Sequence, residues 1–214
     1  MKLHLFSLFP FLACILLSQN NEFKKQGPSP LAVFSAEWND VKFLNCNTAA
    51  TTHYLSDHEK EVIYILNLLR ADPKLFANTV VEKYPEYNNQ LYLKNIPEYK
   101  SLLETLRNSK PLSLLYPDSL CFESAKCHAL YSGKMAYVGH ERKTEECKVK
   151  KHYEGECCQY GYEDALSILM DLLIDQNVPS LGHRFLCLSD YARIGVSIQP
   201  HTGYGHNTVV DFYY

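Results

Sequence analysis

The chain has 214 residues, with 21 lysines and arginines against 24 aspartates and glutamates, and a formal net charge of −3 at pH 7. This length suits one domain with a sizeable core. The balance is weakly acidic and the nearest basic run, Lys148 to His152, is short, which argues against a nucleic-acid partner.

The N-terminus has the pattern of an export signal. Lys2 precedes an apolar run over residues 3–17, which has the length of a signal-peptide core and is too short for a membrane span of about 20 residues. We therefore expect residues 1–18 to be a cleaved signal peptide. The mature protein would be secreted and extracellular, or periplasmic in a Gram-negative source, without stable membrane insertion. Lipidation would instead require cleavage before Cys14.

Seven cysteines remain after such cleavage. Exported proteins usually oxidise their cysteines, so we expect at least two disulfides, and the odd number leaves at least one thiol free or paired with another chain. Cys147 is a sensible partner for Cys157 or Cys158, because the bridge would close a loop of about ten residues. The seven are Cys46, Cys121, Cys127, Cys147, Cys157, Cys158 and Cys187.

The first part of the chain predicts an extension followed by a helix. Residues 19–56 are polar and contain proline, which indicates an N-terminal extension that lies on the domain or is partly mobile. Ser56 or Asp57 can cap the helix that follows, because an apolar stripe at helical spacing comes next. The stripe is Val62, Ile65, Leu66 and Leu69. Asp72-Pro73 restarts the helix, since proline is tolerated in a first turn.

The middle of the chain alternates between expected loops and helices. Residues 84–95, rich in tyrosine, asparagine and proline, predict a loop, and the leucines of residues 102–106 mark a short helix. Pro117-Asp118 opens another helix that ends near Met135. Residues 139–154 are charged and indicate a loop.

The last part predicts one helix and two strands. Residues 165–173 carry helical periodicity, and Asn-Val-Pro at 177–179 ends it. Residues 192–199 and 208–213 predict strands joined by a turn at 201–205. Helices first and a hairpin last indicate an α+β layered domain rather than a βαβ repeat.

Four segments, in order, resemble the CAP superfamily, which covers cysteine-rich secretory proteins, antigen 5, plant pathogenesis-related proteins and SCP-like extracellular proteins of bacteria. Residues 67–73 look like its N-x-x-R-x-x-P helix, and residues 125–140 look like the helix that delivers its first site histidine. Gly155-Glu156 matches the start of its G-E-N motif, and residues 181–184 are similar to its G-H-R motif. The resemblance covers a CAP (SCP-like) domain over residues 57–214.

The resemblance implies a three-layer α-β-α sandwich of the CAP type. It also implies a cleft that gathers His140, Glu156 and His183. Two departures are visible in the sequence. Cys157 stands where the family usually has asparagine, and the second cleft carboxylate of larger members has no certain match, Asp175 being the nearest.

The three cleft residues are 16 and 27 positions apart, so only the resemblance brings them together. Two imidazoles and a carboxylate can bind a divalent ion such as Zn²⁺ with an open position, or share a proton. The alternative is that the histidines are hydrogen-bonded structural groups. A thiol nucleophile at Cys157 or Cys158 is a further alternative, although disulfide pairing is favoured in an oxidising compartment.

These patterns predict a secreted, non-catalytic CAP domain protein that binds an extracellular protein, a lipid or sterol, or a glycan through the His/Glu cleft. The alternative is a metal-assisted hydrolase or peptidase that uses His140, Glu156 and His183, with Zn²⁺ on the two histidines. A third hypothesis is a structural secreted domain joined to another chain through its unpaired cysteine.

Overall fold

The computed structural model describes residues 27–214, so the predicted signal peptide lies outside the described residues. The helices are α1 Asp57–Ala71, α2 Pro73–Leu75, α3 Glu82–Tyr87, α4 Pro97–Asn108, α5 Ser119–Met135, α6 Glu145–Val149, α7 Ala165–Ile174 and α8 Gly182–Cys187. The strands are β1 Tyr116–Pro117, β2 Gly155–Tyr160, β3 Arg193–His201 and β4 Gly205–Tyr213. Among these described residues, no helix is both long and apolar enough to cross a membrane.

The four strands form one mixed sheet in the order β1-β3-β4-β2. β3 and β4 are the predicted C-terminal hairpin, which is confirmed, and β2 pairs with β4 in antiparallel register. β1 pairs with β3 in parallel. The mixture of helices with a largely antiparallel sheet is compatible with the expected α+β class.

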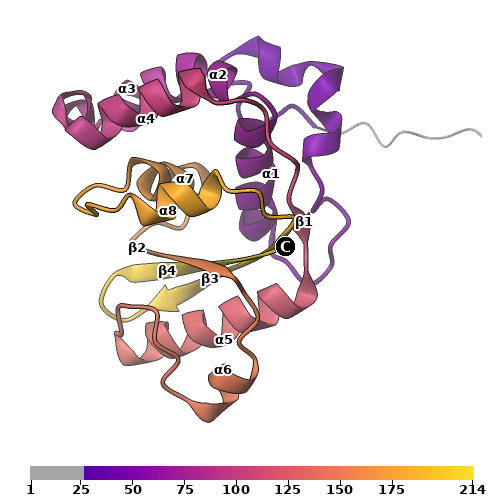
Figure 1. The fold of residues 1–214 in the computed structure, drawn as a ribbon, viewed down its shortest axis with the longest axis vertical. Coiled ribbons are helices and arrows are strands. Elements are labelled where there is room, and N and C mark those ends of the chain that lie inside the picture. Colours follow the sequence, from indigo (N-terminus) through magenta and orange to yellow (C-terminus); the bar gives the residue numbers. More distant parts are fainter. Residues whose placement is uncertain (1–26) are drawn as a thin grey trace, which may run out of the picture.

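Helices cover both faces of the sheet (Figure 1). α5 lies along one face against β3 and β4. α1, α7 and α8 contact the strands from the other face, and α4 packs on α7 beyond them. The molecule is therefore built in helix, sheet and helix layers, with most of the core between the sheet and the α1–α7 side.

Two glycines let α5 lie close to the sheet. A Cβ on Gly195 of β3 would stand 2.2 Å from the backbone of Cys121 and Phe122. A Cβ on Gly133, near the other end of α5, would stand 2.0 Å from the carbonyl oxygen of Pro200. Contacts this short are sterically forbidden, so a side chain at either position would push the helix off the sheet.

The segment 67–73 serves the scaffold. Asn67 is buried, accepts from the backbone N–H of Leu115 and donates to the carbonyls of Leu115 and Cys46. Arg70 is fully buried and donates to four backbone carbonyls, those of Ser113, Cys187, Ser189 and Tyr191. The two side chains thus join α1 to the loops before β1 and β3.

The predicted loop over residues 84–95 is wrong. A π-helical segment, Phe76–Val81, carries the helix from α2 into α3, and a 3₁₀ turn, Leu91–Asn95, follows. Pro85 lies inside α3 and cannot donate to the carbonyl of Val81, four residues earlier. The hydroxyl of Tyr99 donates to that carbonyl instead, at 2.9 Å, so a tertiary contact stabilises a helix that the local sequence disfavours. The predicted loop over residues 139–154 also contains the short helix α6.

The described part of the predicted extension, residues 27–56, lies on the domain. Its apolar side chains belong to the same core cluster as α1 and α7. Trp38 is almost completely buried, and its indole N–H donates to the hydroxyl of Thr79 at 3.0 Å. The core therefore extends across residue 57, where the sequence suggested the domain would begin.

The predicted disulfide is wrong: Cys147 of α6 bonds to Cys127 of α5. Cys157 and Cys158 are adjacent on β2, so their side chains lie on opposite faces of the sheet. Cys157 belongs to the main core cluster, and Cys158 packs with α5 residues. Both are buried and free, so the expected second disulfide is also absent from residues 27–214. The free cysteines there are Cys46, Cys121, Cys157, Cys158 and Cys187.

Candidate functional site

Two histidine–carboxylate pairs meet beside the end of β2. His140 Nδ1 lies 2.9 Å from Glu156 Oε1, and His183 Nδ1 lies 2.7 Å from Asp175 Oδ1. The centroids of the two imidazole rings are 6.1 Å apart. The structure therefore brings His140, Glu156 and His183 together, and it supplies Asp175 as the second carboxylate.

The loop that carries His140 is held by its neighbour Gly139. The N–H of Gly139 donates to the hydroxyl of Tyr160, and its carbonyl accepts from His128 Nε2 at 2.8 Å. Gly139 has a φ of +135°, which side-chain-bearing residues rarely adopt. The buried His128 therefore has a structural role, because it fixes the backbone beside the candidate site.

His183 and Asp175 come from neighbouring helix ends. Asp175 follows the last turn of α7 with a left-handed φ of 56°, a conformation that aspartate tolerates better than most residues. Its second carboxylate oxygen accepts from the backbone N–H of His183 at 2.9 Å. Both the ring and the backbone of His183 are thus tied to one carboxylate.

The two histidines share the same tautomer. A carboxylate accepts from Nδ1 in each pair, so the neutral ring carries its proton on Nδ1 and keeps a lone pair on Nε2. The His140 side chain is 54% exposed and that of His183 is 21% exposed, whereas the carboxylates of Glu156 and Asp175 are buried. The site can therefore offer two Nε2 donor atoms to one ligand.

Glu156 belongs to a buried ion cluster with Arg142 and Asp211. Arg142 forms an ion pair with Glu156 and lies 3.4 Å from Asp211, which stands opposite Glu156 in the β2–β4 register. Burial raises the pKa of Glu156, but the His140 hydrogen bond and the Arg142 pair outweigh it and lower the pKa to about 2. Burial and the charge of Glu156 raise the pKa of Asp211 well above its ordinary value.

The cluster therefore favours a charged Glu156 beside the guanidinium and disfavours a second negative charge on Asp211. Glu156 is fully engaged, with one oxygen toward His140 and the other toward Arg142. Its donor atom also lies within 4.8 Å of donor atoms of His128 and Cys158. A cation placed among those three would stand beside the Arg142 charge, so this buried group is a poor metal site.

The thiol of Cys158 lies 3.5 Å from His140 Nδ1. Burial and the neighbouring Glu156 charge raise its pKa well above the ordinary value, so the thiol stays protonated. Cys157 faces the other side of the sheet, with its sulfur 3.7 Å from the carbonyl of His183, and burial raises its pKa in the same way. Neither cysteine has the character of a reactive nucleophile.

A hollow of about 220 Å³ opens beside the two histidine pairs. Its lining includes His183, Asp175, Asp171, Gln159 and Cys158. His140 is not part of the lining, but its ring contacts Cys158 and faces the ring of His183. Elsewhere, a larger hollow of about 460 Å³ lies beside the N-terminal segment and the start of α1. We assign the candidate site to the smaller hollow because oriented, accessible histidines converge there.

No family model, curated protein or solved structure matches this chain. The chemistry of the described residues is therefore the basis for assigning a function.

Sequence reasoning missed Arg142 and Asp211. Asp211 had a detectable signal, because a carboxylate inside the apolar strand 209–212 must find a buried partner. Arg142 had none, since it lies in a charged stretch whose other members face solvent. Asp175 was identified only as the nearest acidic residue, and its contact with His183 depends on the turn between α7 and α8.

Proposed function

We propose that the protein is an exported, non-catalytic CAP-type domain that binds an extracellular glycan in the hollow beside His140 and His183. A divalent cation, Zn²⁺ in the first instance, would be held by the two imidazoles. The observation that supports this proposal is the pairing of each ring with its own buried carboxylate. Carboxylates behind Nδ1 are the usual outer partners of metal-binding histidines.

The ring positions suit a shared ion. A zinc ion about 2.1 Å from a ring nitrogen lies about 3 Å from the ring centre. A centroid separation of 6.1 Å is within the span of two rings on one ion, which the Nε2 atoms would share if both turned toward it. Two protein ligands leave coordination positions that a ligand's oxygen atoms can fill.

The hollow favours a glycan over the lipid or sterol that the resemblance also allowed. Its volume of about 220 Å³ is below the roughly 300–1,000 Å³ of sites that enclose drug-sized apolar ligands. Asp171, Gln159 and Gln176 line it with polar atoms, which suit sugar hydroxyls. Tyr204 is exposed on the lining and offers a ring face to a sugar.

A binding role is favoured over hydrolysis because, with both imidazoles on the ion, neither Glu156 nor Cys158 is left as a general base or nucleophile. Glu156 is committed to His140 and Arg142, and the low pKa means that it carries no proton to donate near neutral pH. Cys158 is a protonated, buried thiol. The metal-assisted hydrolase would have to rely on a metal-bound water alone.

Zinc titration of the mature protein by calorimetry tests the metal. His183→Ala and His140→Ala should each lose one equivalent of Zn²⁺, and Asp175→Asn should weaken that equivalent by about 10–100-fold. Zinc affinity should fall in acid, because protonated imidazole cannot bind metal. His58→Ala, an exposed histidine on α1, is the matched control and should bind as the parent does.

Glycan-array binding with and without a chelator tests the ligand. We expect binding that is lost with the chelator and in His183→Ala, provided that the melting temperature shows a folded variant. Unchanged zinc binding in both cleft variants would refute the metal site. Zinc-dependent cleavage of peptide or ester substrates, lost in the same variants, would favour the hydrolase instead.

A further inference from the structure

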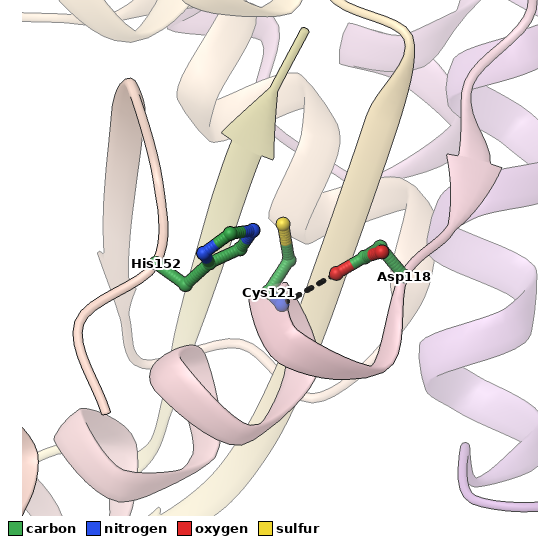
Figure 2. A group of neighbouring side chains, drawn as sticks. All are labelled: Asp118, Cys121 and His152. Atoms are coloured by element: carbon green, nitrogen blue, oxygen red, sulfur yellow. Dashed lines mark hydrogen bonds between the residues drawn. The ribbon is translucent and has the colours of Figure 1, made fainter. Parts of the chain in front are cut away.

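Asp118, Cys121 and His152 converge at the start of α5, away from the histidine cleft. Figure 2 shows the Cys121 side chain between the imidazole of His152 and the carboxylate of Asp118. One donor atom from each, an oxygen, a sulfur and a nitrogen, lies within 4.8 Å of the other two. The first two residues belong to the start of α5, and the third comes from the segment between α6 and β2.

The α5 side of this group is rigidly placed. Asp118 is the N-cap, and its Oδ1 accepts from the backbone N–H groups of Leu120 and Cys121, each at 2.9 Å. The other carboxylate oxygen takes no part in this cap. Cys121 is completely buried in the first turn, where the absent side chain of Gly195 lets the helix backbone rest on β3.

The His152 side is held by stacking. Its ring lies on the ring of Tyr213, with centroids 4.4 Å apart and planes 20° apart. His152 and Asp118 are only partly buried, whereas Cys121 is buried. A small ion can therefore reach the group from solvent while the sulfur remains shielded.

We propose that Asp118, Cys121 and His152 form a second divalent-metal site, selective for a thiophilic ion such as Zn²⁺. Sulfur and imidazole ligands favour zinc over Mg²⁺ or Ca²⁺, which take oxygen ligands. One thiolate and one carboxylate balance the charge of the ion, and the Cys121 thiol proton leaves to solvent on binding. Burial and the carboxylate of Asp118 raise the pKa of the Cys121 thiol, so the bound ion itself must displace the proton, as metals do at a coordinating thiol.

The spacing of the group suits zinc after a small adjustment. Zinc ligands at bond lengths of about 2.0–2.3 Å and tetrahedral angles lie about 3.5 Å apart. Donor atoms within 4.8 Å of each other need to close by about an ångström, which the partly exposed His152 segment can supply. Three protein ligands leave a fourth position for water. The ion would tie α5 to the segment that leads into β2, the strand that carries Glu156.

Cobalt substitution tests the site, because a cobalt–thiolate bond gives a charge-transfer absorption band that histidine and carboxylate ligands do not give. Mature protein with intact Cys127–Cys147 should develop this band with one equivalent of Co²⁺ and lose it when Zn²⁺ is added. Cys121→Ser should abolish the band, and His152→Gln should weaken cobalt binding at least tenfold. Asp118→Asn, which retains a capping oxygen, should weaken it by less.

Two controls separate this site from the cleft. Cys46→Ser removes another buried free thiol and should leave the band unchanged. The His140→Ala/His183→Ala double variant should also keep the band, so failure of the proposed cleft metal would leave this result intact. Zinc should raise the melting temperature of the double variant but not that of the triple variant that also carries His152→Gln.

The purely structural alternative makes Asp118 a helix cap and Cys121 a small core residue. This alternative predicts that the parent protein shows no cobalt–thiolate band, or that any such band survives in Cys121→Ser. Either result would overturn the proposal. His152→Gln keeps the test decisive if Cys121→Ser fails to fold, because His152 is partly exposed.

Discussion

Replacing the two facing carboxylates one at a time should have very different effects on stability. Glu156→Gln removes the charged partner of Arg142, whereas Asp211→Asn replaces a carboxyl whose ionisation the native state disfavours. The pKa of Glu156 is lowered because His140 and Arg142 overcome the cost of burial, and the pKa of Asp211 is raised by burial and by the charge of Glu156. The two substitutions have the same chemistry but act on carboxyl groups whose pKa values are shifted in opposite directions.

The magnitude follows from the pKa of Glu156. A pKa lowered from 4.5 to about 2 corresponds, at about 1.4 kcal/mol per pH unit, to about 3 kcal/mol of stability at neutral pH. Asp211 lies 3.4 Å from Arg142 and can ionise when Glu156 is gone, so Glu156→Gln should cost about 1–3 kcal/mol. Asp211→Asn should change stability by less than about 1 kcal/mol. The double variant leaves Arg142 without a counterion and should cost about 3–5 kcal/mol.

Urea denaturation of the four proteins at pH 7 gives the coupling free energy between the two sites. The double variant should be less stable than the two single effects predict together. Below pH 4.5 Glu156 takes up a proton in the unfolded chain but not yet in the native state. The parent should therefore lose this stability as the pH falls toward 2, and Glu156→Gln should lose less. Additive effects, or an Asp211→Asn variant as unstable as Glu156→Gln, would refute the charge assignment.

Three further predictions test the scaffold by thermal or urea denaturation. Gly195→Ala should lower the stability by more than about 2 kcal/mol, because the new Cβ would lie 2.2 Å from the α5 backbone. The control Gly182→Ala meets only a side-chain atom at 3.4 Å and should cost little. Equal effects of the two substitutions would contradict the close packing of α5 on β3. Arg70→Met should cost about 3 kcal/mol or more because buried carbonyls lose their donor, and a change under about 1 kcal/mol would refute the clamp. Cys127→Ser and Cys147→Ser should each lower the stability by about 2–4 kcal/mol, and the double variant should lose no more than either single variant. Peptide mapping without reduction that finds another partner for Cys147 would overturn the pairing.

The elements with strong local signals were predictable from the sequence. α1 begins with a capping box, in which the side chain of Ser56 accepts from the backbone N–H of Glu59 and the side chain of Glu59 accepts from that of Ser56. Its apolar stripe is continuous. α5 and α7 are each capped by an aspartate before a periodic run, and the β3–β4 hairpin has turn residues between two strands. In these segments local preference and tertiary packing favour the same structure.

The elements that were missed depend on distant contacts. β2 is buried on both faces, so its sequence lacks the alternation that marks a half-exposed strand. α3 contains Pro85, and only the distant Tyr99 hydroxyl satisfies the carbonyl that this proline leaves free. α8 is six residues long, too short for a periodicity to be visible.

The candidate site was predictable in residue type but not in geometry. His140, Glu156 and His183 were identified together only through the family resemblance, and spacing alone gave no reason for them to meet. The partners that decide their chemistry, Arg142 for the charge of Glu156 and Asp175 for the orientation of His183, depend on turns and register that no local pattern specifies. This explains why the sequence suggested Glu156 as a metal ligand, whereas the contacts make it an orienting group.

The two halves of the cleft differ in how firmly the core holds them. His183 is bonded to Asp175 through both ring and backbone, and the next residue, Arg184, is buried and donates to the last carbonyls of α7. His140 lies on a loop, is half exposed, and depends on Gly139 for its backbone position. A ligand that binds both rings would therefore find one imidazole preorganised and the other adjustable. The entropic cost of closing the site would then fall mainly on the His140 loop, which is why changes at Gly139 should affect binding more than folding.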